Sequence, residues 1–220
     1  MAKATTNETK AAASNTQGLD YYRQWKLDEA VEAFKDAAAH DTNNPEYHLN
    51  LARAYARGGK YHEAIRALGD YIHAEKDEKL ASRYERLFST ALDEVEEKMI
   101  AGMQNLDLSV PLVGKAIQMW LEYRIAIGRQ PLRTPKPEIW AAALTYAVCK
   151  VNLMEITREQ VGEAFAVKDR SLKDKYDDLL DTLDLLPGDY RYFTGEENPL
   201  DDLIEAAEEL NQIYQSFRDA

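Results

Sequence analysis

Cysteine, glycine and proline are scarce in this chain of 220 residues, and it has no long apolar run. Cys149 is the only cysteine, so no disulfide can form within the chain, which predicts a reducing compartment, the cytoplasm. Ten glycines and seven prolines, against abundant Ala, Leu, Glu and Lys, favour helix over strand. No apolar run approaches the roughly 18 residues of a membrane-spanning helix, so we expect no contact with a membrane.

The N-terminal stretch also has no apolar segment of the kind that a secretory signal needs. Residues 1–13 are rich in Ala, Thr, Asn and Lys, and we expect them to form a disordered tail. Apolar residues nevertheless make up 45% of the chain, which excludes disorder over most of its length.

The signatures of common catalytic and cofactor sites are missing. The sequence contains no GxxxxGK[ST] or GxGxxG phosphate loop, no HExxH or CxxC metal pattern and no GxSxG nucleophile elbow. The four histidines (His40, His48, His62 and His73) are not spaced as metal ligands, and Cys149 has none nearby in the sequence. We therefore expect no enzyme, no catalytic residue, no metal, no cofactor and no small-molecule substrate.

Charge is plentiful but unevenly distributed. The net charge is −12, yet residues 111–150 carry six basic and two acidic side chains, an excess of +4. Residues 181–220 carry two arginines against eleven acids, an excess of −9. A chain this acidic is repelled by nucleic acid unless a local basic patch outweighs the rest.

The first half of the chain contains an internal repeat. A shift of 34 residues aligns three pairs of similar residues: Tyr21 with Tyr55, Ala30 with Ala64, and Phe34 with Leu68. Turn-forming residues at 43–45 and 58–59 separate stretches with helical spacing. Small residues at matched positions predict two antiparallel helices in close contact, with the larger apolar side chains filling the space beyond them. The repeat therefore predicts a pair of helical hairpins.

These positions resemble the tetratricopeptide repeat, whose pattern is Gly-x-x-Tyr followed by Ala-x-x-x-Phe at a 34-residue period. The matching positions are Gly18-x-x-Tyr21 with Ala30-x-x-x-Phe34, and Ala52-x-x-Tyr55 with Ala64-x-x-x-Leu68. The sequence departs from the family at Ser14 and His48 (often Trp), Gln17 (Leu) and Thr42 (Pro). The resemblance covers roughly residues 11–78 and implies an all-α array of hairpins that binds other proteins.

A third copy of the pattern fails, because a further shift places Ser89 on Tyr55 and Lys98 on Ala64. Residues 79–104 instead have the apolar spacing of one long helix, from Leu80 to Val95. Two repeats alone cannot bury a continuous core, so we expect this helix to cap the array. The array with its capping helix is then predicted to cover residues 14–104.

In the tetratricopeptide family, the inner face of the first helix of each hairpin usually lines the ligand groove. Carried over by position, the resemblance implies a partner-binding groove that contains Tyr22, Arg23, Asn50, Arg53 and Arg57. A tyrosine with three arginines would suit an acidic or C-terminal peptide. The alternative is that the arginines are solvated surface residues. The family's carboxylate clamp needs basic residues from a third repeat, so clamp-type binding is not expected.

The second half has the pattern of a separate helical domain. Helices are predicted from about Leu112 to Ile127 and from Ile139 to about Leu153, and the second is almost wholly apolar, so it should be the buried centre. Thr157 and Gln160 form a capping box that begins a helix-turn-helix pattern with a turn near Ala166. Asp169 or Ser171 is expected to cap its second helix.

The order of an alanine-rich helix, a helix-turn-helix and a Pro-Gly-Asp-Tyr-Arg-Tyr exit resembles the second cyclin-like repeat of transcription factor IIB. The resemblance covers about residues 112–193, and the segment from Lys136 onward also looks like bacterial domains with a cyclin-type helix-turn-helix. It brings no metal ligand and no catalytic residue. The candidates for nucleic-acid contact are Arg158, Lys168, Arg170 and Lys173.

The charge of this helix-turn-helix opposes DNA binding. Its second helix carries acids at five positions, namely Asp174, Asp177, Asp178, Asp181 and Asp184, whereas a recognition helix needs donors for phosphates and base edges. The alternative is a motif used for packing or for binding a protein. The leading hypothesis is thus a cytoplasmic protein–protein adaptor, the second a transcription-type regulator that contacts DNA, and a third an accessory subunit of an enzyme complex.

Residues 196–220 have apolar side chains at helical spacing among eight acids and one arginine. This pattern predicts an acidic amphipathic helix at the C-terminus. Such a helix would dock on its own domain, or it would bind a partner or mask a surface.

Overall fold

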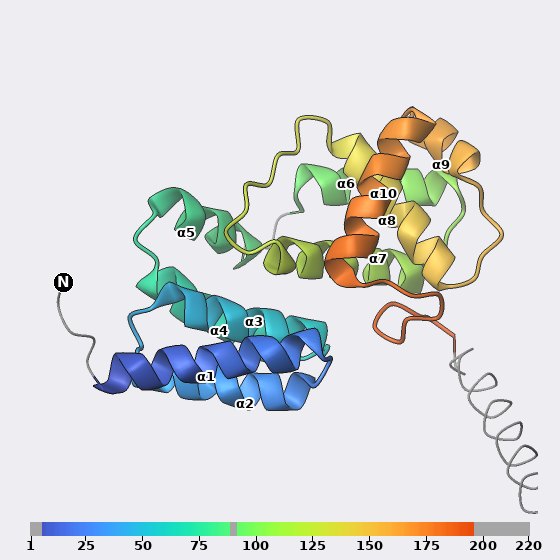
Figure 1. Ribbon diagram of the computed structural model, residues 1–220. Coiled ribbons are helices and arrows are strands. Elements are labelled where there is room, and N and C mark those ends of the chain that lie inside the picture. The colour runs from blue at the N-terminus through green and yellow to red at the C-terminus, as the bar shows by residue number, and fades with distance from the viewer. Residues whose placement is uncertain (1–5, 89–91, 196–220) are drawn as a thin grey trace, which may run out of the picture. The chain divides into compact units, whose positions relative to one another are not determined.

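The computed structural model describes residues 6–88 and 92–195, and all regular structure in these ranges is helical (Figure 1). The predicted all-α class is confirmed. The chain divides into two compact units, one formed by Met1–Leu92 with Trp120–Arg133, the other by Asp93–Met119 with Thr134–Ala220.

The first unit begins with two helical hairpins. Helices α1 (Thr6–Arg23) and α2 (Leu27–His40) form the first, and α3 (Pro45–Arg57) and α4 (Tyr61–Ala74) form the second. Figure 1 shows these four helices side by side in the blue and cyan part of the ribbon. The start of α3 follows local rules, because Pro45 stands at its first turn and the Asn44 side chain accepts a hydrogen bond from the Glu46 N–H at 3.1 Å.

Small residues set the spacing inside the hairpins, as the repeat predicts. Ala30 and Ala64 are fully buried, and Phe34 and Leu68 belong to the same core cluster. Gly18 faces Phe34 so closely that a Cβ atom added to the glycine would lie 2.6 Å from two ring carbons. The glycine, alanine and phenylalanine of the repeat pattern therefore allow the helices to pack closely.

The predicted disordered tail is wrong from residue 6 onward. Helix α1 already begins at Thr6, and Ala11 is completely buried in a small cluster with Ala37, Ala38 and Tyr47. The stretch is mostly polar, but its Ala11 side chain packs against α2 and the start of α3. Residues 1–5 lie outside the described residues.

The single long helix predicted over residues 79–104 is also wrong. Helix α5 (Glu78–Glu85) and a 3-10 turn (Arg86–Phe88) are separated from α6 (Glu94–Asn105), and residues 89–91 lie outside the described residues. The physical reason is a capping box, in which Asp93 accepts from the Glu96 N–H and the Glu96 side chain accepts from the Asp93 N–H. This arrangement starts a new helix within the apolar pattern.

The boundary of the units also differs from the predicted one. Helix α6 groups with the second unit, whereas residues 120–133 group with the first. The latter residues are the last turns of α7 (Val110–Ala126) and the loop that follows. Ile125 is fully buried in the core cluster of the array, and Leu121 packs against that cluster.

The second unit is built around α8 (Pro137–Val151), against which α6 and α10 (Asp169–Leu183) pack. Ten of the 15 residues of α8 are buried, which confirms the prediction of a buried central helix. Gly102 of α6 allows a close approach here, because an added Cβ atom would overlap the Phe165 ring.

The segment predicted as a helix-turn-helix consists of α9 (Arg158–Ala164), a turn and α10. The predicted capping box of Thr157 and Gln160 is confirmed, with bonds of 3.2 and 2.8 Å. Ala166 occupies the turn with a φ of +54°. The predicted cap of the second helix is wrong, since Lys168 stands at the N-cap without a side-chain bond, and the Asp169 carboxylate instead pairs with Arg158 Nε at 3.2 Å.

The exit segment after α10 is fixed by a buried ion pair between Asp189 and Arg191 (2.7 Å). The Arg191 carbonyl accepts hydrogen bonds from Lys115 Nζ and Gln118 Nε2 of α7 at 2.8 and 2.9 Å. The predicted acidic helix of residues 196–220 lies outside the described residues. Within the described ranges, no helix has both the length and the apolar character needed to cross a membrane.

Candidate functional site

Two arginines of α3 and two aromatic rings form a cluster at one end of the array. The Arg57 guanidinium carbon lies 4.6 Å from the centre of the Tyr22 ring and 4.1 Å from that of Trp25. The Arg53 guanidinium carbon lies 5.7 Å from the Tyr22 ring centre. Such distances favour cation–π attraction. Arg53 and Arg57 therefore meet at the ring of Tyr22, another predicted groove residue, and Arg53 Nη1 also donates to Asn50 Oδ1 at 3.4 Å.

Trp25 is the member that sequence reasoning missed. It lies in the turn between α1 and α2 with a φ of +59°, and this left-handed backbone allows its ring to lie over the end of α3. Its side chain remains 42% exposed, although large aromatic residues favour burial. An exposed tryptophan beside arginines is typical of a surface that binds a partner.

The remaining predicted groove residues are Asn50 and Arg23. Asn50 is buried, and besides its contact with Arg53 its side-chain amide donates to Asn15 Oδ1 at 3.0 Å, which joins α3 to α1. Arg23 is 73% exposed and pairs with Asp20 on its own helix at 3.0 Å. Asn50 thus acts on helix packing, whereas Arg23 is accessible from solvent.

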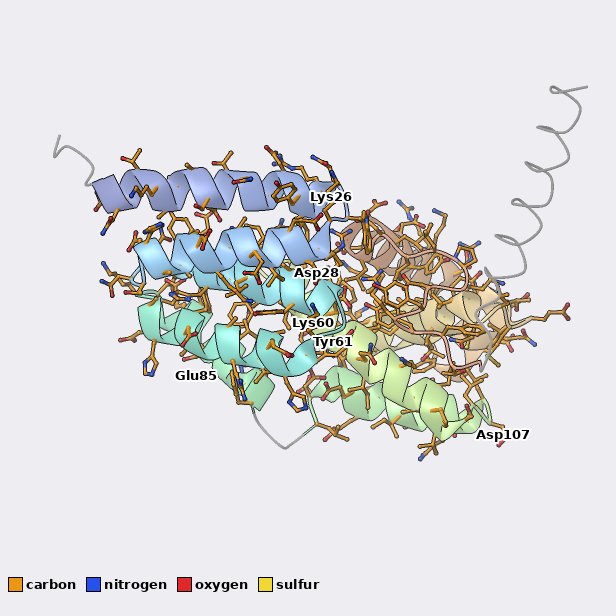
Figure 2. The ribbon with its side chains drawn as sticks, turned by 90° about the horizontal axis from the view of Figure 1, so that it is seen from below. Lys26, Asp28, Lys60, Tyr61, Glu85 and Asp107 are labelled. Carbon is orange, nitrogen blue, oxygen red and sulfur yellow. The ribbon has the colours of Figure 1, made fainter. Side chains whose placement is uncertain are left out.

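The turns between helices bring further charges to the same end of the array. Figure 2 shows Lys26, Asp28, Lys60 and Tyr61 together there. Lys60 Nζ lies 2.7 Å from a carboxylate oxygen of Asp28, so the two hairpins are linked by an ion pair across their turns. Both side chains are well exposed, and such a pair contributes little to stability.

Residues 125–130 of the first unit lie against the surface of α3 that carries Leu49. The Gly128 carbonyl accepts hydrogen bonds from the Tyr84 hydroxyl at 2.7 Å and from the Arg83 guanidinium, and Arg83 also donates to the Gln130 carbonyl. A Cβ atom on Gly128 would lie 3.8 Å from Leu49. Residues 125–130 therefore lie against α3 and α5, which the sequence did not predict.

Glu75, at the end of α4, forms an ion pair with Arg129 of this segment. Its carboxylate lies 2.5 Å from Arg129 Nη1, and it accepts from the Tyr71 hydroxyl at 2.7 Å and from the N–H groups of Lys76 and Asp77 at 2.9 and 3.0 Å. Burial pushes the pKa of Glu75 upward, but the Asp77 N–H, Tyr71 and Arg129 outweigh it, so this pKa lies below its ordinary value. The carboxylate is therefore charged at neutral pH.

The four predicted nucleic-acid contacts lie on α9, on α10 and in the turn between them, and two of the four are paired with acids. Arg158 pairs with Asp169, and Lys173 pairs with Asp177 one turn further along α10. Lys168 and Arg170 are exposed at the start of α10. The ion pairs reduce the positive charge that the motif offers to a phosphate backbone.

Neither a metal centre nor a reactive thiol is found in the part of the chain that the structure describes. No three His, Cys, Asp or Glu residues are grouped there in a way that could hold a metal ion. Cys149 is fully buried in α8, and burial raises the pKa of its thiol to about 12. A thiol with that pKa stays protonated at neutral pH and is a poor nucleophile.

In the comparison with known families, the model of the tetratricopeptide repeat matches residues 22–87. The match spans α2, α3, α4 and α5, but only the last two residues of α1, so it covers the second predicted hairpin and one helix of the first. No curated protein and no solved structure matches the chain. The resemblance of residues 112–193 to a cyclin-like repeat has no support among these comparisons and stays a prediction.

Proposed function

We propose that this protein is a non-catalytic scaffold of the cytoplasm that binds a partner protein through its helical hairpin array. The family match over residues 22–87 carries this proposal, because tetratricopeptide repeats generally mediate protein–protein interaction. We place the contact with the partner at the cluster of Tyr22, Trp25, Arg53 and Arg57. Aromatic and arginine side chains are enriched where partners bind, and they contribute much of the binding energy.

The chemistry of this cluster favours an acidic segment of the partner. Arginine guanidinium groups pair with carboxylates through two parallel hydrogen bonds. Arg53 is half-buried and Arg23 is exposed nearby on α1, so both can meet a carboxylate without unfolding of the array. Tyr22 and Trp25 would cover the apolar part of the same segment.

The first prediction concerns partner recovery. We expect Arg23→Glu with Arg53→Glu to reduce recovery of the partner from the native host at least about tenfold, because two attractive charges become repulsive. Arg57 is left unchanged, since it is buried between two rings. The measurement is affinity purification with quantitative mass spectrometry, with helicity checked by circular dichroism.

Arg66→Glu is the matched control for that experiment. Arg66 is an exposed arginine of α4, outside the cluster, and its reversal changes the net charge in the same direction. Recovery that falls equally in the control and in the double variant would attribute the effect to overall charge. Full recovery by the double variant would place the binding surface elsewhere.

The second hypothesis, a regulator that contacts DNA, leads to a separate prediction. We expect no measurable binding of duplex DNA by the intact chain at physiological salt, because Arg158 and Lys173 are paired and the net charge is −12. The measurement is fluorescence anisotropy with random duplex DNA at low and physiological salt. Submicromolar binding at physiological salt would favour the regulator, and loss of that binding in Lys168→Glu with Arg170→Glu would locate it on α10.

A further inference from the structure

The second unit has a surface groove at the turns in which α6 and α8 end. Two hollows share Leu108 and Met154 as lining residues, so they join into one groove, named the exit groove below. Its apolar lining comes from both turns, from the start of α7 and from the segment after α10: Leu106, Leu108, Leu112, Met154, Ile156 and Phe193. All of these residues belong to the second unit.

The two turns have the same backbone geometry. In each, a residue with a left-handed backbone follows the helix: Asp107 (φ +54°) after α6 and Leu153 (φ +56°) after α8. The next N–H, that of Leu108 or Met154, donates to the carbonyl five residues earlier at 3.0 Å. This helix ending commonly packs the apolar side chain that follows it back onto the helix. Here Leu108 and Met154 stay half-buried and Leu153 is 55% exposed, so apolar surface is left open at both turns.

The charges beside this apolar surface are negative. Three exposed acids line the exit groove, namely Asp107, Glu155 and Glu163. Among the described residues that line it there is no lysine or arginine, and none of the three acids forms an ion pair within the described ranges. Asp107 also follows the carbonyl end of α6, whose last turn has no basic residue, so the carboxylate and the helix dipole have the same sign there. A cation at the groove would relieve this repulsion.

We propose that the exit groove docks a basic amphipathic helix of a partner protein. The apolar side of such a helix would cover Leu108 and Met154, and its lysines or arginines would meet Asp107, Glu155 and Glu163. Apolar contact supplies most of the affinity in this mode of binding, and complementary charge selects the partner. The inference goes beyond the proposed function, because it gives the scaffold a contact surface outside the hairpin array.

The chain's own C-terminal residues fit this groove less well. They follow Gly195, which lines the groove, and their apolar residues have helical spacing. However, residues 196–220 carry eight acids and one arginine, so they have the same sign of charge as the groove. The charge therefore favours a basic partner over this segment.

The test uses the full chain and two labelled synthetic peptides of identical composition, made of leucine, lysine and alanine. In one peptide the leucines follow the spacing i, i+3, i+4 and form one helix face, and in the other they are scattered around the helix. Equal charge makes the unspecific attraction to an acidic protein the same for both. By fluorescence anisotropy at physiological salt, the first peptide should bind at least about tenfold more tightly than the second.

Two charge-reversal variants locate the binding. Glu155→Lys with Glu163→Lys should abolish the difference between the two peptides, because the groove would then repel their lysines. Asp174→Lys with Asp181→Lys is the matched control, since it reverses two exposed acids of α10 that do not line the groove, and it should keep the difference. Circular dichroism checks that both variants keep their helicity.

Equal binding of the two peptides would contradict the proposal, as would a difference that survives in Glu155→Lys with Glu163→Lys or disappears in the α10 control. A third peptide, which copies residues 199–220, should not bind. If it bound more tightly than the basic peptide, the occupant would be the chain's own C-terminal segment and not a basic partner. A dimer in analytical ultracentrifugation that Glu155→Lys with Glu163→Lys dissociates would make a second copy the occupant, which also contradicts the proposal. All these variants leave the Tyr22 cluster unchanged, so the result is independent of the partner-recovery experiment.

Discussion

Arg191→Ala should lower the free energy of unfolding of the second unit by about 3–5 kcal/mol, because it leaves a buried carboxylate without its partner. The Arg191 and Asp189 side chains are 0% and 6% exposed, and the Arg191 Nε and Nη2 groups lie 3.0 and 2.7 Å from the two carboxylate oxygens. Arg191 Nη2 also donates to the Leu183 carbonyl at the end of α10, at 2.7 Å. The substitution therefore removes bonds to two segments at once.

The measurement is urea unfolding followed by circular dichroism, with hydrogen exchange of α8 and α10 to assign the loss to the second unit. Lys173→Ala is the matched control, since it breaks an exposed ion pair on α10 and should cost only about 0.3–0.5 kcal/mol. Asp189→Ala combined with Arg191→Ala should cost less than the sum of the two single changes, because no unpaired charge remains. Equal costs for Arg191→Ala and Lys173→Ala would show that the buried pair has no special role.

Gly18→Ala should destabilise the first unit by about 1–3 kcal/mol, although alanine is normally the better helix former. The added Cβ atom would lie 2.6 Å from two carbons of the Phe34 ring, and Phe34 is only 1% exposed. The α1–α2 hairpin would have to open to admit one methyl group.

Gly69 supplies the comparison within the same unit. It lies inside α4, and a Cβ atom added there has no neighbour within 4 Å. Gly69→Ala should therefore stabilise the array by about 0.5–1 kcal/mol, through the lower conformational entropy of the unfolded chain. Thermal unfolding of both variants should show melting shifts of opposite sign. Shifts of the same sign would mean that the glycine of the repeat pattern is not there for packing.

The hairpins could be predicted because their determinants are local and repeated. Similar residues recur at a period of 34, and the buried Ala30 and Ala64 lie where adjacent helices pack. The capping box at Thr157, in the second unit, is also local, because it acts between neighbours in sequence. The interruption near Asp93 has a local signal as well, the Asp-x-x-Glu capping box. The apolar spacing of residues 79–104 outweighed that signal in the prediction.

The position of residues 120–133 could not be predicted from the sequence. Their contacts with the array join residues some 45 positions apart, such as Tyr84 with Gly128, and depend on one carbonyl at the right place. The candidate site was predictable in part, because helical spacing brings Arg53 and Arg57 to one face. Trp25 joins them only through the left-handed backbone of a turn, and no residue pattern specifies that conformation.

Lysine crosslinking of the purified complex, followed by mass spectrometry, tests whether a partner protein binds to the hairpin array. Lys26 and Lys60 lie at the end of the array that carries the Tyr22 cluster (Figure 2). Crosslinks to the partner should involve these two lysines and should be lost in Arg23→Glu with Arg53→Glu. Partner crosslinks confined to Lys168 and Lys173 of the helix-turn-helix, and unchanged in that variant, would contradict it.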